Sequence, residues 1–471
     1  MKFTFVGASY RARSSNVNAE NCINLFPEMS NETAKTVAAL YGTPGKRLWA
    51  NLPGGAIRGV YTVNKTIAVA VSGPNVYTLD TSGNATLVGV VSAEASIVKM
   101  ASNGTTVVIV TGKDWYSLNP TTGEFLTLPV TAFTGADVID YIDGYYIFNV
   151  PDTGNFQITR LYSTDTDALS FANAEGSPDK VVSLIVNHRE VWVFGEVSTE
   201  VFYDEGDLDF PIIRINGAFI EQGCAAKFSV AKLDNAVFWL TSDAKGQGMI
   251  ARSQGYSWTR VSTHALEFAI AGYSRIDDAI AYTYQMEGHS FYQITFPTAN
   301  KTLVYDAATG LWHERAYRNP VDGSMNRDRG QCQMQFAGET IVGDWENGNL
   351  YALDMDTYTD NGDPIVRVRT APHASSPDLD WIRFARFLLD IEPGVGVIGQ
   401  SAPTACLQWS DNGGKTWSSE YWATFGELGE YGARALWRRL GKSRCRTFRV
   451  SIMDPVKVVI LGASVKLGDD K

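Results

Sequence analysis

The chain has 471 residues, of which 45% are hydrophobic and 19% are charged, and its formal net charge at pH 7 is −11. These values are typical of a globular protein with room for two or three domains, and they exclude an intrinsically disordered chain. The acidic excess also argues against a dominant nucleic-acid-binding surface.

Several common kinds of site and segment are not indicated by the sequence. The 5 cysteines are far apart and form no CxxC pair, so neither a zinc site nor a disulfide framework is expected. No apolar stretch approaches the roughly 20 residues that a membrane helix needs, and GxSxG, GxxxxGK(S/T) and HExxH motifs are missing. We therefore expect no membrane span, no metal and no cofactor, and folding in a reducing cytoplasm.

The N-terminal region differs from the rest of the chain in its lack of pattern. Residues 14–48 show little hydrophobic periodicity and contain a Thr-Pro-Gly turn at residues 43–45. We expect residues 1–50 to form an extended arm.

Strand signals dominate the long central region, residues 51–365. Short runs rich in β-branched and aromatic residues, such as residues 106–110, are bounded by Gly, Asn, Asp or Pro. The best helix signal is residues 263–272, with Thr263 as the N-cap and Gly272 as the stop. The strands group into units that begin near Ile57, Ile97, Val138, Val181, Cys224, Ala279 and Gln331. A spacing of roughly 40–50 residues with three or four strands is typical of a propeller blade, so we predict an all-β fold with a β-propeller of six or seven blades.

The last part of the chain, residues 366–471, has strand signals of its own. These lie at residues 384–391, 405–410, 447–453 and 456–467. A small set of strands with this patterning predicts a β-sandwich-like C-terminal domain.

A hairpin-like motif, SDNGGKTW at residues 410–417, lies in this domain. Its spacing is that of the Asp box of sialidases, with Asn412 where the Asp would stand. Asn and Gly tolerate the left-handed conformations of a tight turn. We expect the motif to stabilise a sheet, because a single degenerate copy outside the propeller does not indicate a sialidase.

An acidic stretch occupies residues 198–210, and a second one lies at residues 353–363. The carboxylates of the first are Glu200, Asp204, Glu205, Asp207 and Asp209. Solvated turns explain such stretches. Two further hypotheses are a glycosidase pair of carboxylates roughly 5–9.5 Å apart and an acidic loop or channel lining that repels DNA phosphate.

A basic stretch occupies residues 433–449 and carries no acid. Its cations are Arg434, Arg438, Arg439, Lys442, Arg444, Arg446 and Arg449. Arginine forks suit the carboxylates of a partner protein or the phosphates of DNA, and we favour the protein. The alternative is a set of strand-edge arginines that prevent aggregation.

Several blocks together resemble a known family of short-tailed phage proteins, the packaged DNA stabilisation proteins. No single block is a catalytic motif, so the resemblance rests on the set and its order. The blocks are residues 14–28, 40–48, 190–212, 215–224, 359–370, 409–417 and 431–444.

The resemblance implies a structural virion protein of the tail hub or nozzle, with no enzyme activity. It implies a hexameric ring of propeller subunits below the portal and its adaptor ring, which continues the DNA channel and retains the packaged double-stranded DNA. Tail fibres, spikes or a needle would attach to the ring, which would assemble in the host cytoplasm. The alternative is a glycan-binding or glycan-hydrolysing propeller protein of the sialidase kind.

Overall fold

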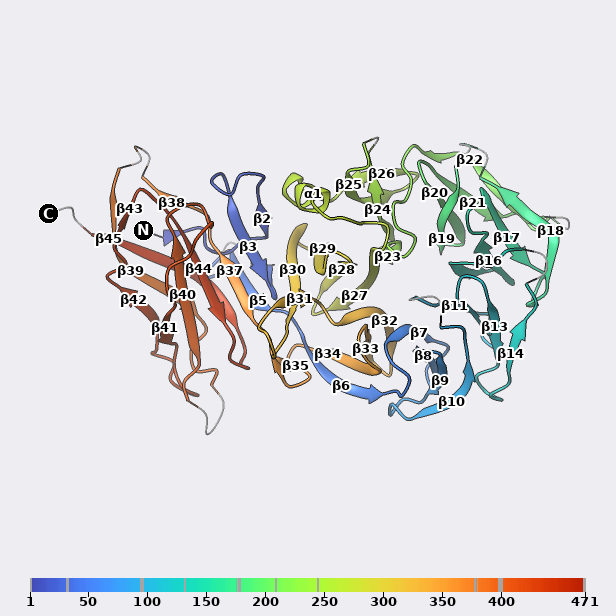
Figure 1. Cartoon of the computed structure of the whole chain (residues 1–471), viewed down its shortest axis with the longest axis horizontal. Coiled ribbons are helices and arrows are strands. Elements are labelled where there is room, and N and C mark those ends of the chain that lie inside the picture. Colours follow the sequence, from blue (N-terminus) through green and yellow to red (C-terminus); the bar gives the residue numbers. More distant parts are fainter. Residues whose placement is uncertain are drawn as a thin grey trace.

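The computed structural model describes residues 2–468 except 31–33, 94–96, 131–132, 175, 177–178, 208–209, 244, 377, 379 and 397–400. Two β domains lie side by side, a ring of small sheets and a sandwich of two larger ones (Figure 1). This confirms the prediction of an all-β fold with a propeller and a C-terminal sandwich. Within the described residues, no helix is long and apolar enough to cross a membrane.

Seven blades make up the propeller in the described part of the chain, each with four antiparallel strands. Blades 1 to 4 comprise β7 (Ile57–Thr62), β8 (Ala68–Ser72), β9 (Asn75–Leu79) and β10 (Ala85–Val90); β11 (Lys99–Ser102), β12 (Val107–Val110), β13 (Trp115–Leu118) and β14 (Phe125–Leu128); β15 (Ile139–Ile142), β16 (Tyr145–Asn149), β17 (Asn155–Thr159) and β18 (Thr166–Asn173); and β19 (Val181–Asn187), β20 (Glu190–Gly195), β21 (Thr199–Asp204) and β22 (Ile212–Ile220). Blades 5 to 7 comprise β23 (Ala231–Leu233), β24 (Ala236–Ser242), β25 (Gly248–Gln254) and β26 (Ser257–Arg260); β27 (Ile280–Met286), β28 (His289–Phe296), β29 (Lys301–Asp306) and β30 (Leu311–Arg318); and β32 (Gly330–Phe336), β33 (Glu339–Asp344), β34 (Asn349–Asp354) and β6 (Gly45–Asn51).

The fourth strand of blade 7 comes from the other end of the propeller sequence. β6 pairs antiparallel with β34, from Asn51 opposite Asn349 to Gly45 opposite Asp354. The ring is therefore closed by hydrogen bonds between strands about 300 residues apart. Three short strands flank the last blades: β31 (Met325–Arg327), β35 (Thr359–Asp360) and β36 (Asp363–Pro364).

The helix predicted in the central region is confirmed. α1 (His264–Ala271) connects blades 5 and 6, and the side chain of Thr263 accepts a hydrogen bond from the Leu266 N–H as the N-cap. Gly272 is the C-cap.

The sandwich consists of two sheets. One has the order β4-β5-β45-β39-β42, and the other continues from β30 of blade 6 in the order β3-β37-β44-β40-β41. Short strands β1, β43, β2 and β38 pair with β45, β39, β3 and β44, respectively. The bounds are β1 (Lys2–Phe3), β2 (Tyr10–Arg11), β3 (Ala19–Ile23), β4 (Leu25–Met29), β5 (Ala38–Gly42), β37 (Arg367–Thr370), β38 (Ala374–Ser375), β39 (Ile382–Ile391), β40 (Thr404–Ser410), β41 (Tyr421–Thr424), β42 (Ala435–Arg438), β43 (Lys442–Ser443), β44 (Cys445–Ile452) and β45 (Val459–Gly468).

The N-terminal segment is extended, and its strands pair with strands of both domains. β1, β4 and β5 join one sandwich sheet, β2 and β3 join the other, and β6 belongs to blade 7. An extended arm without apolar periodicity can order in this way because its backbone groups pair with sheet edges that already exist.

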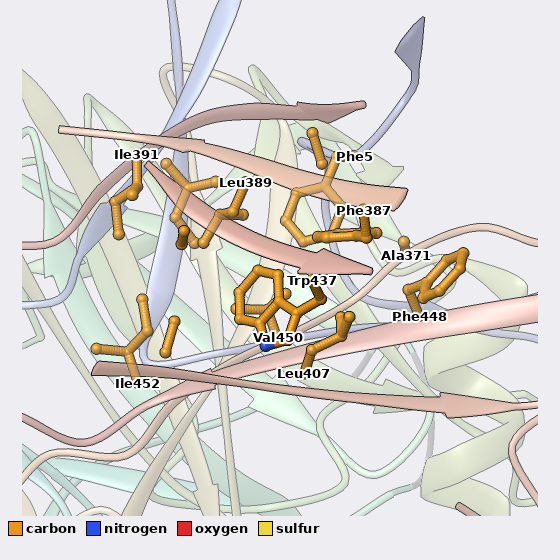
Figure 2. Packing of buried hydrophobic residues seen from close by; sticks show 14 of the residues in the cluster. Phe5, Ala371, Phe387, Leu389, Ile391, Leu407, Trp437, Phe448, Val450 and Ile452 are labelled. Atoms are coloured by element: carbon orange, nitrogen blue, oxygen red, sulfur yellow. The ribbon is translucent and has the colours of Figure 1, made fainter. Parts of the chain in front are cut away.

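The sandwich core brings together residues from the N-terminal segment and from the last hundred or so residues of the chain. Phe5 packs edge-on against Phe387, with 6.0 Å between ring centroids, and Phe387 also packs against Phe448 at 4.9 Å (Figure 2). All three side chains are at most 1% exposed. The N-terminal arm is therefore part of this core.

Buried ion pairs hold the N-terminal segment to each of the two domains. Lys46 of β6 lies 2.6 Å from Asp328 and 3.0 Å from Asp360, and Arg369 of β37 pairs with Glu20 of β3. Such pairs stabilise only while both partners are present, because removing one leaves a buried charge uncompensated. They fix how the N-terminal segment lies between propeller and sandwich.

A histidine makes a further contact between the arm and the propeller. His289 of β28 lies between Asp306, 2.8 Å from its Nδ1, and Glu28 of β4, 2.5 Å from its Nε2. The hydrogen bond with Asp306, followed by the one with Glu28, raises the pKa of His289 to about 9 against the opposing effect of burial. At neutral pH the imidazole is therefore protonated and bound to two carboxylates.

Candidate interaction surface

The basic stretch at residues 433–449 lies on β42, β43 and β44, and its side chains separate into two groups. Five of them are exposed: Arg434, Arg438, Arg439, Lys442 and Arg444. Arg446 is buried and Arg449 is partly buried. Only the exposed residues are available to a partner.

The strand register places further cations beside the exposed ones. Arg386 of β39 lies opposite Arg438 on one side and opposite Lys466 of β45 on the other. We name Arg386, Arg438 and Lys466 the basic row. Three residues before Arg386 on the same strand, Arg383 lies opposite Lys442 of β43.

Alternation along β39 explains why the basic row faces solvent. Phe384, Phe387 and Leu389 are buried in the sandwich core, whereas Arg383 and Arg386 are exposed. Successive residues of a strand point to opposite faces, and a register shift between Phe384 and Arg386 lets both arginines face solvent although they are three residues apart. Figure 1 shows β39, β42 and β43 on the side of the sandwich farthest from the propeller.

Like charges directly opposite each other are destabilising in a sheet. In the described part of the chain, no carboxylate forms an ion pair with Arg386, Arg438 or Lys466. The basic row is therefore an uncompensated positive surface on a chain whose net charge is −11.

Arg446 acts inside the domain. Its guanidinium binds both carboxylate oxygens of Asp411, at 2.7 and 2.8 Å, and stacks over Phe384 and Trp409. It is 2% exposed. The contact role that the sequence suggested for Arg446 is thus corrected to a structural role, because its charge is already bound within the subunit.

The SDNGGKTW motif is a tight turn held by its own side chains. Asn412 Oδ1 accepts hydrogen bonds from the backbone N–H groups of Lys415 and Thr416, and Ser410 Oγ accepts one from Gly414. Gly413 and Gly414 have φ values of 71° and 84°, where glycine is favoured. The motif is sheet-stabilising, as expected.

At the base of this turn, Arg449 lies over the Trp417 ring, 3.9 Å from its centroid. Its guanidinium also donates a 2.6 Å hydrogen bond to Gln408 Oε1. Arg449 is therefore largely occupied by its own domain and is separate from the basic row.

The described carboxylates of the acidic stretch of blade 4 lie in different settings. Glu200 is buried, pairs with Arg214 at 2.8 Å and accepts a hydrogen bond from the Gly176 N–H. Asp204, Glu205 and Asp207 lie at or after the end of β21, in the connection to the outermost strand β22. Asp209 lies outside the described residues.

The second acidic stretch is also used within the fold. Asp360 pairs with Lys46, and Asp363 accepts a 2.7 Å hydrogen bond from the Tyr317 hydroxyl. Asp354 accepts hydrogen bonds from its own turn. Within the described residues, no group of three or more His, Cys, Asp or Glu side chains could hold a metal ion.

A cavity of about 480 Å³ is lined by residues at or just before the first strands of several blades, among them Ile97, Asp137 and Ile280. Two ion pairs lie on its wall, Lys227 with Asp137 at 2.8 Å and Arg275 with Asp277 at 2.6 Å. The Phe228 ring lies close to the ammonium groups of Lys227 and Lys99. This volume is that of a small-molecule pocket, far too small for a DNA duplex.

Comparison with protein families decides what kind of chain this is. The model described as Bacteriophage P22 Gp10, beta-propeller, matches residues 5–358, and the model described as Bacteriophage P22 Gp10, beta-sandwich, matches residues 371–468. The chain belongs to the bacteriophage P22 Gp10 family.

The P22 Gp10 family consists of structural phage tail proteins linked to stabilisation of packaged DNA. The chain is therefore a structural component of a phage tail and not an enzyme, as the sequence indicated. The family match also confirms the resemblance noted in the seven sequence blocks.

Other comparisons add little to this assignment. The search of curated proteins finds no match. Among solved structures, the N-terminal domain of Nup159 has 11% identity and a TM-score of 0.43, covering 69% of this chain and 98% of that one. The computationally designed Ika8 protein has 11% identity and a TM-score of 0.38, covering 71% and 100%. At these scores neither structure carries an argument.

Three residues of the exposed basic face were missed by sequence reasoning: Arg383, Arg386 and Lys466. They lie on strands that are separated in sequence from residues 433–449. The signal that could have found two of them is the repeated Arg-Phe pair at residues 383–384 and 386–387, in which each arginine precedes an apolar residue.

Proposed function

We propose that this P22 Gp10-family protein is a tail hub or nozzle subunit that assembles into a hexameric ring below the portal and its adaptor. The ring continues the DNA channel, retains the packaged genome and carries fibres, spikes or a needle. The observation that carries the proposal is the basic row on the exposed side of the sandwich, in a chain of this family. Assembly takes place in the host cytoplasm, where free cysteines are kept reduced.

The basic row supports a protein contact. Opposed like charges destabilise a sheet by about 0.2–1 kcal/mol for each pair, and carboxylates of a partner would remove this repulsion. Arginine forks bind carboxylates in a bidentate manner. An acidic surface of a neighbouring subunit or of the adaptor therefore fits the row better than DNA, which the net charge of −11 repels.

The DNA channel runs between subunits in this proposal. The cavity of about 480 Å³ in one propeller, lined in part by Lys227 and Phe228, is far too small to hold a DNA duplex. A ring of subunits supplies a wider opening on its symmetry axis, and an acidic wall there keeps DNA from adhering.

Assembly of the purified protein tests the proposal. Light scattering and negative-stain microscopy, with and without adaptor and portal, are expected to show a sixfold ring, either alone or on the adaptor. The double variant Arg386→Glu/Arg438→Glu should reduce assembly at least tenfold at low salt, and Lys415→Glu, a charge reversal at the exposed hairpin turn, serves as the control.

Two outcomes contradict the proposal at different levels. A chain that stays monomeric with adaptor and portal present refutes the ring. Rings that form equally well with the double variant show that the basic row is not the contact. Circular dichroism of each variant verifies that the fold is retained.

A further inference from the structure

A cavity of about 210 Å³ lies where the propeller, the N-terminal segment and the sandwich meet. Its wall combines the end of β5, the turn between β27 and β28, the segment after β34, the start of β37 and the start of β45. The residues that matter for its chemistry are Arg367, Lys457, Thr43, Tyr358, Glu287 and Asp356.

Arg367 is the exceptional member of this set. It is 1% exposed, and its Nη1 donates one long hydrogen bond of 3.4 Å to the carbonyl oxygen of Asp454. Its Nε is buried and has no hydrogen-bond partner among the described residues. Burial lowers the pKa of Arg367 to about 10, and the attraction of Asp360 compensates only in part.

The other deeply buried arginines show how this protein normally compensates such a charge. Among the described arginines that are at most 2% exposed, Arg315 lies 3.5 Å from Asp328, Arg369 pairs with Glu20, and Arg446 pairs with Asp411. In the described part of the chain, Arg367 alone of this group has no carboxylate within ion-pair distance. A buried charge without a counterion is costly.

The fold makes room for the Arg367 side chain. A Cβ atom built on Gly42 would lie 2.9 Å from Arg367 Nε and 3.5 Å from its Cδ. Because residue 42 is glycine, the guanidinium can lie directly over the β5 backbone and beside the cavity. Close packing against Gly42 therefore fixes the position of the Arg367 side chain.

Further donors line the same cavity. The Thr43 hydroxyl is buried without a partner among the described residues, and Lys457 lies 3.1 Å from Glu392 with half of its side chain exposed. Burial, together with the charge of Asp356, raises the pKa of Tyr358, and the charges of Lys457 and Arg367 oppose this rise. Glu287 and Asp356 are exposed on turns at the rim.

We propose that this interdomain cavity binds one small oxyanion with the size and charge of inorganic phosphate. The anion supplies the negative charge that Arg367 lacks and accepts hydrogen bonds from Arg367, Thr43 and Lys457. A water molecule could accept hydrogen bonds from these donors, but it carries no charge to neutralise the guanidinium. The two rim acids reduce the affinity, so binding is expected at millimolar concentrations.

The site has a consequence for the junction between the domains. β5 belongs to the N-terminal segment, β37 follows the propeller, and β45 is the last strand of the sandwich. An anion held by groups on all three segments ties them together. This inference goes beyond the proposed function and does not depend on ring assembly.

Thermal unfolding of the full chain tests the site. Phosphate is titrated from zero to tens of millimolar against chloride at equal ionic strength, and a saturable rise in Tm of about 1–3 °C is expected. Arg367→Gln should abolish the rise. Arg386→Gln removes a cation of the basic row and shows whether phosphate binds there instead.

A second variant and a direct measurement keep the test decisive if Arg367→Gln does not fold. Thr43→Val should lower the phosphate response, whereas in an empty cavity it would only remove an unsatisfied hydroxyl and leave the response unchanged. Phosphorus-31 line broadening on the wild-type chain reports binding directly. Equal effects of phosphate and chloride, or a response that survives Arg367→Gln but not Arg386→Gln, overturn the proposal.

Discussion

Asp411 and Arg446 show how a single ion pair fixes the C-terminal hairpin. Asp411 stands in the SDNGGKTW turn and is about half exposed, whereas its partner guanidinium is 2% exposed. The pair therefore connects a surface turn to the sandwich core through the rings of Phe384 and Trp409.

Replacing Asp411 by Ala should destabilise the sandwich by about 2–3 kcal/mol, because the buried guanidinium loses its counterion but keeps its backbone acceptors. Urea unfolding followed by tryptophan fluorescence measures the change. Asp390→Ala, which removes a surface pair with Lys35, should change stability by at most about 0.5 kcal/mol. Equal effects of both substitutions would refute the structural role of Asp411.

His289 gives the contact between arm and propeller a pH dependence. Its pKa in the folded state is about 9, and that of an unfolded histidine is about 6.5. The stabilisation is therefore fully present below pH 6.5 and is lost as the pH rises through 9.

The variant His289→Gln checks this. The Tm difference between wild type and variant should be greatest at pH 6 and should decrease steadily towards pH 9.5. A difference that stays constant over this range would show that the proton on His289 does not hold β4 to blade 6.

At the scale of elements, the sequence pattern located the inner strands of the blades well. The predicted unit starts at Ile57 and Val181 are the first residues of β7 and β19. The start at Cys224 is seven residues early, because an apolar segment precedes β23 and Phe228 forms a bridge with Ile280. Periodicity finds apolar segments but does not distinguish a strand from a buried connection.

The number of blades was harder to predict for a physical reason. Blade 7 takes its outer strand from residues 45–51, whose sequence GKRLWAN has no clear alternation. Pairing with the exposed edge of β34 determines its conformation, and local propensity does not reveal this.

The candidate surface was only half predictable for a similar reason. The run at residues 433–449 indicated the cations of β42 and β43, but the register with β39 and β45 decides which of them face a like charge. Pairings across tens of residues depend on the folded sheet, so sequence proximity could not separate Arg446 from its exposed neighbours.

The close fit of β6 offers a sharp test at this scale. A Cβ atom on Gly45 would lie 2.1 Å from the backbone oxygen of Thr357. Gly45→Ala should therefore displace β6 or the following segment and cost about 3 kcal/mol. Gly432, whose added Cβ would meet nothing within 4 Å, is the matched control.

For Gly432→Ala we expect a change of no more than about 1 kcal/mol, in the stabilising direction if any. Thermal unfolding of both variants gives the comparison. If Gly45→Ala unfolds at the wild-type temperature, the contact between β6 and residue 357 is not the constraint that the structure indicates.

At the scale of the whole molecule, propeller and sandwich form one continuous framework. β3 pairs with β30 of blade 6 and with β37 of the sandwich, and the ion pair between Glu20 and Arg369 also joins β3 to β37. A subunit of this kind transmits a force applied at the sandwich directly to the propeller, which suits a structural tail protein.

The antiparallel pairing of β1 with β45 sets an order of events during synthesis. Lys2 lies opposite Ser464, so the first strand waits for nearly the whole chain before it finds its partner. At about 5–20 residues per second, that wait lasts on the order of half a minute or longer. Lys466 emerges in the same last strand, so a truncated product lacks both the partner of β1 and the complete basic row.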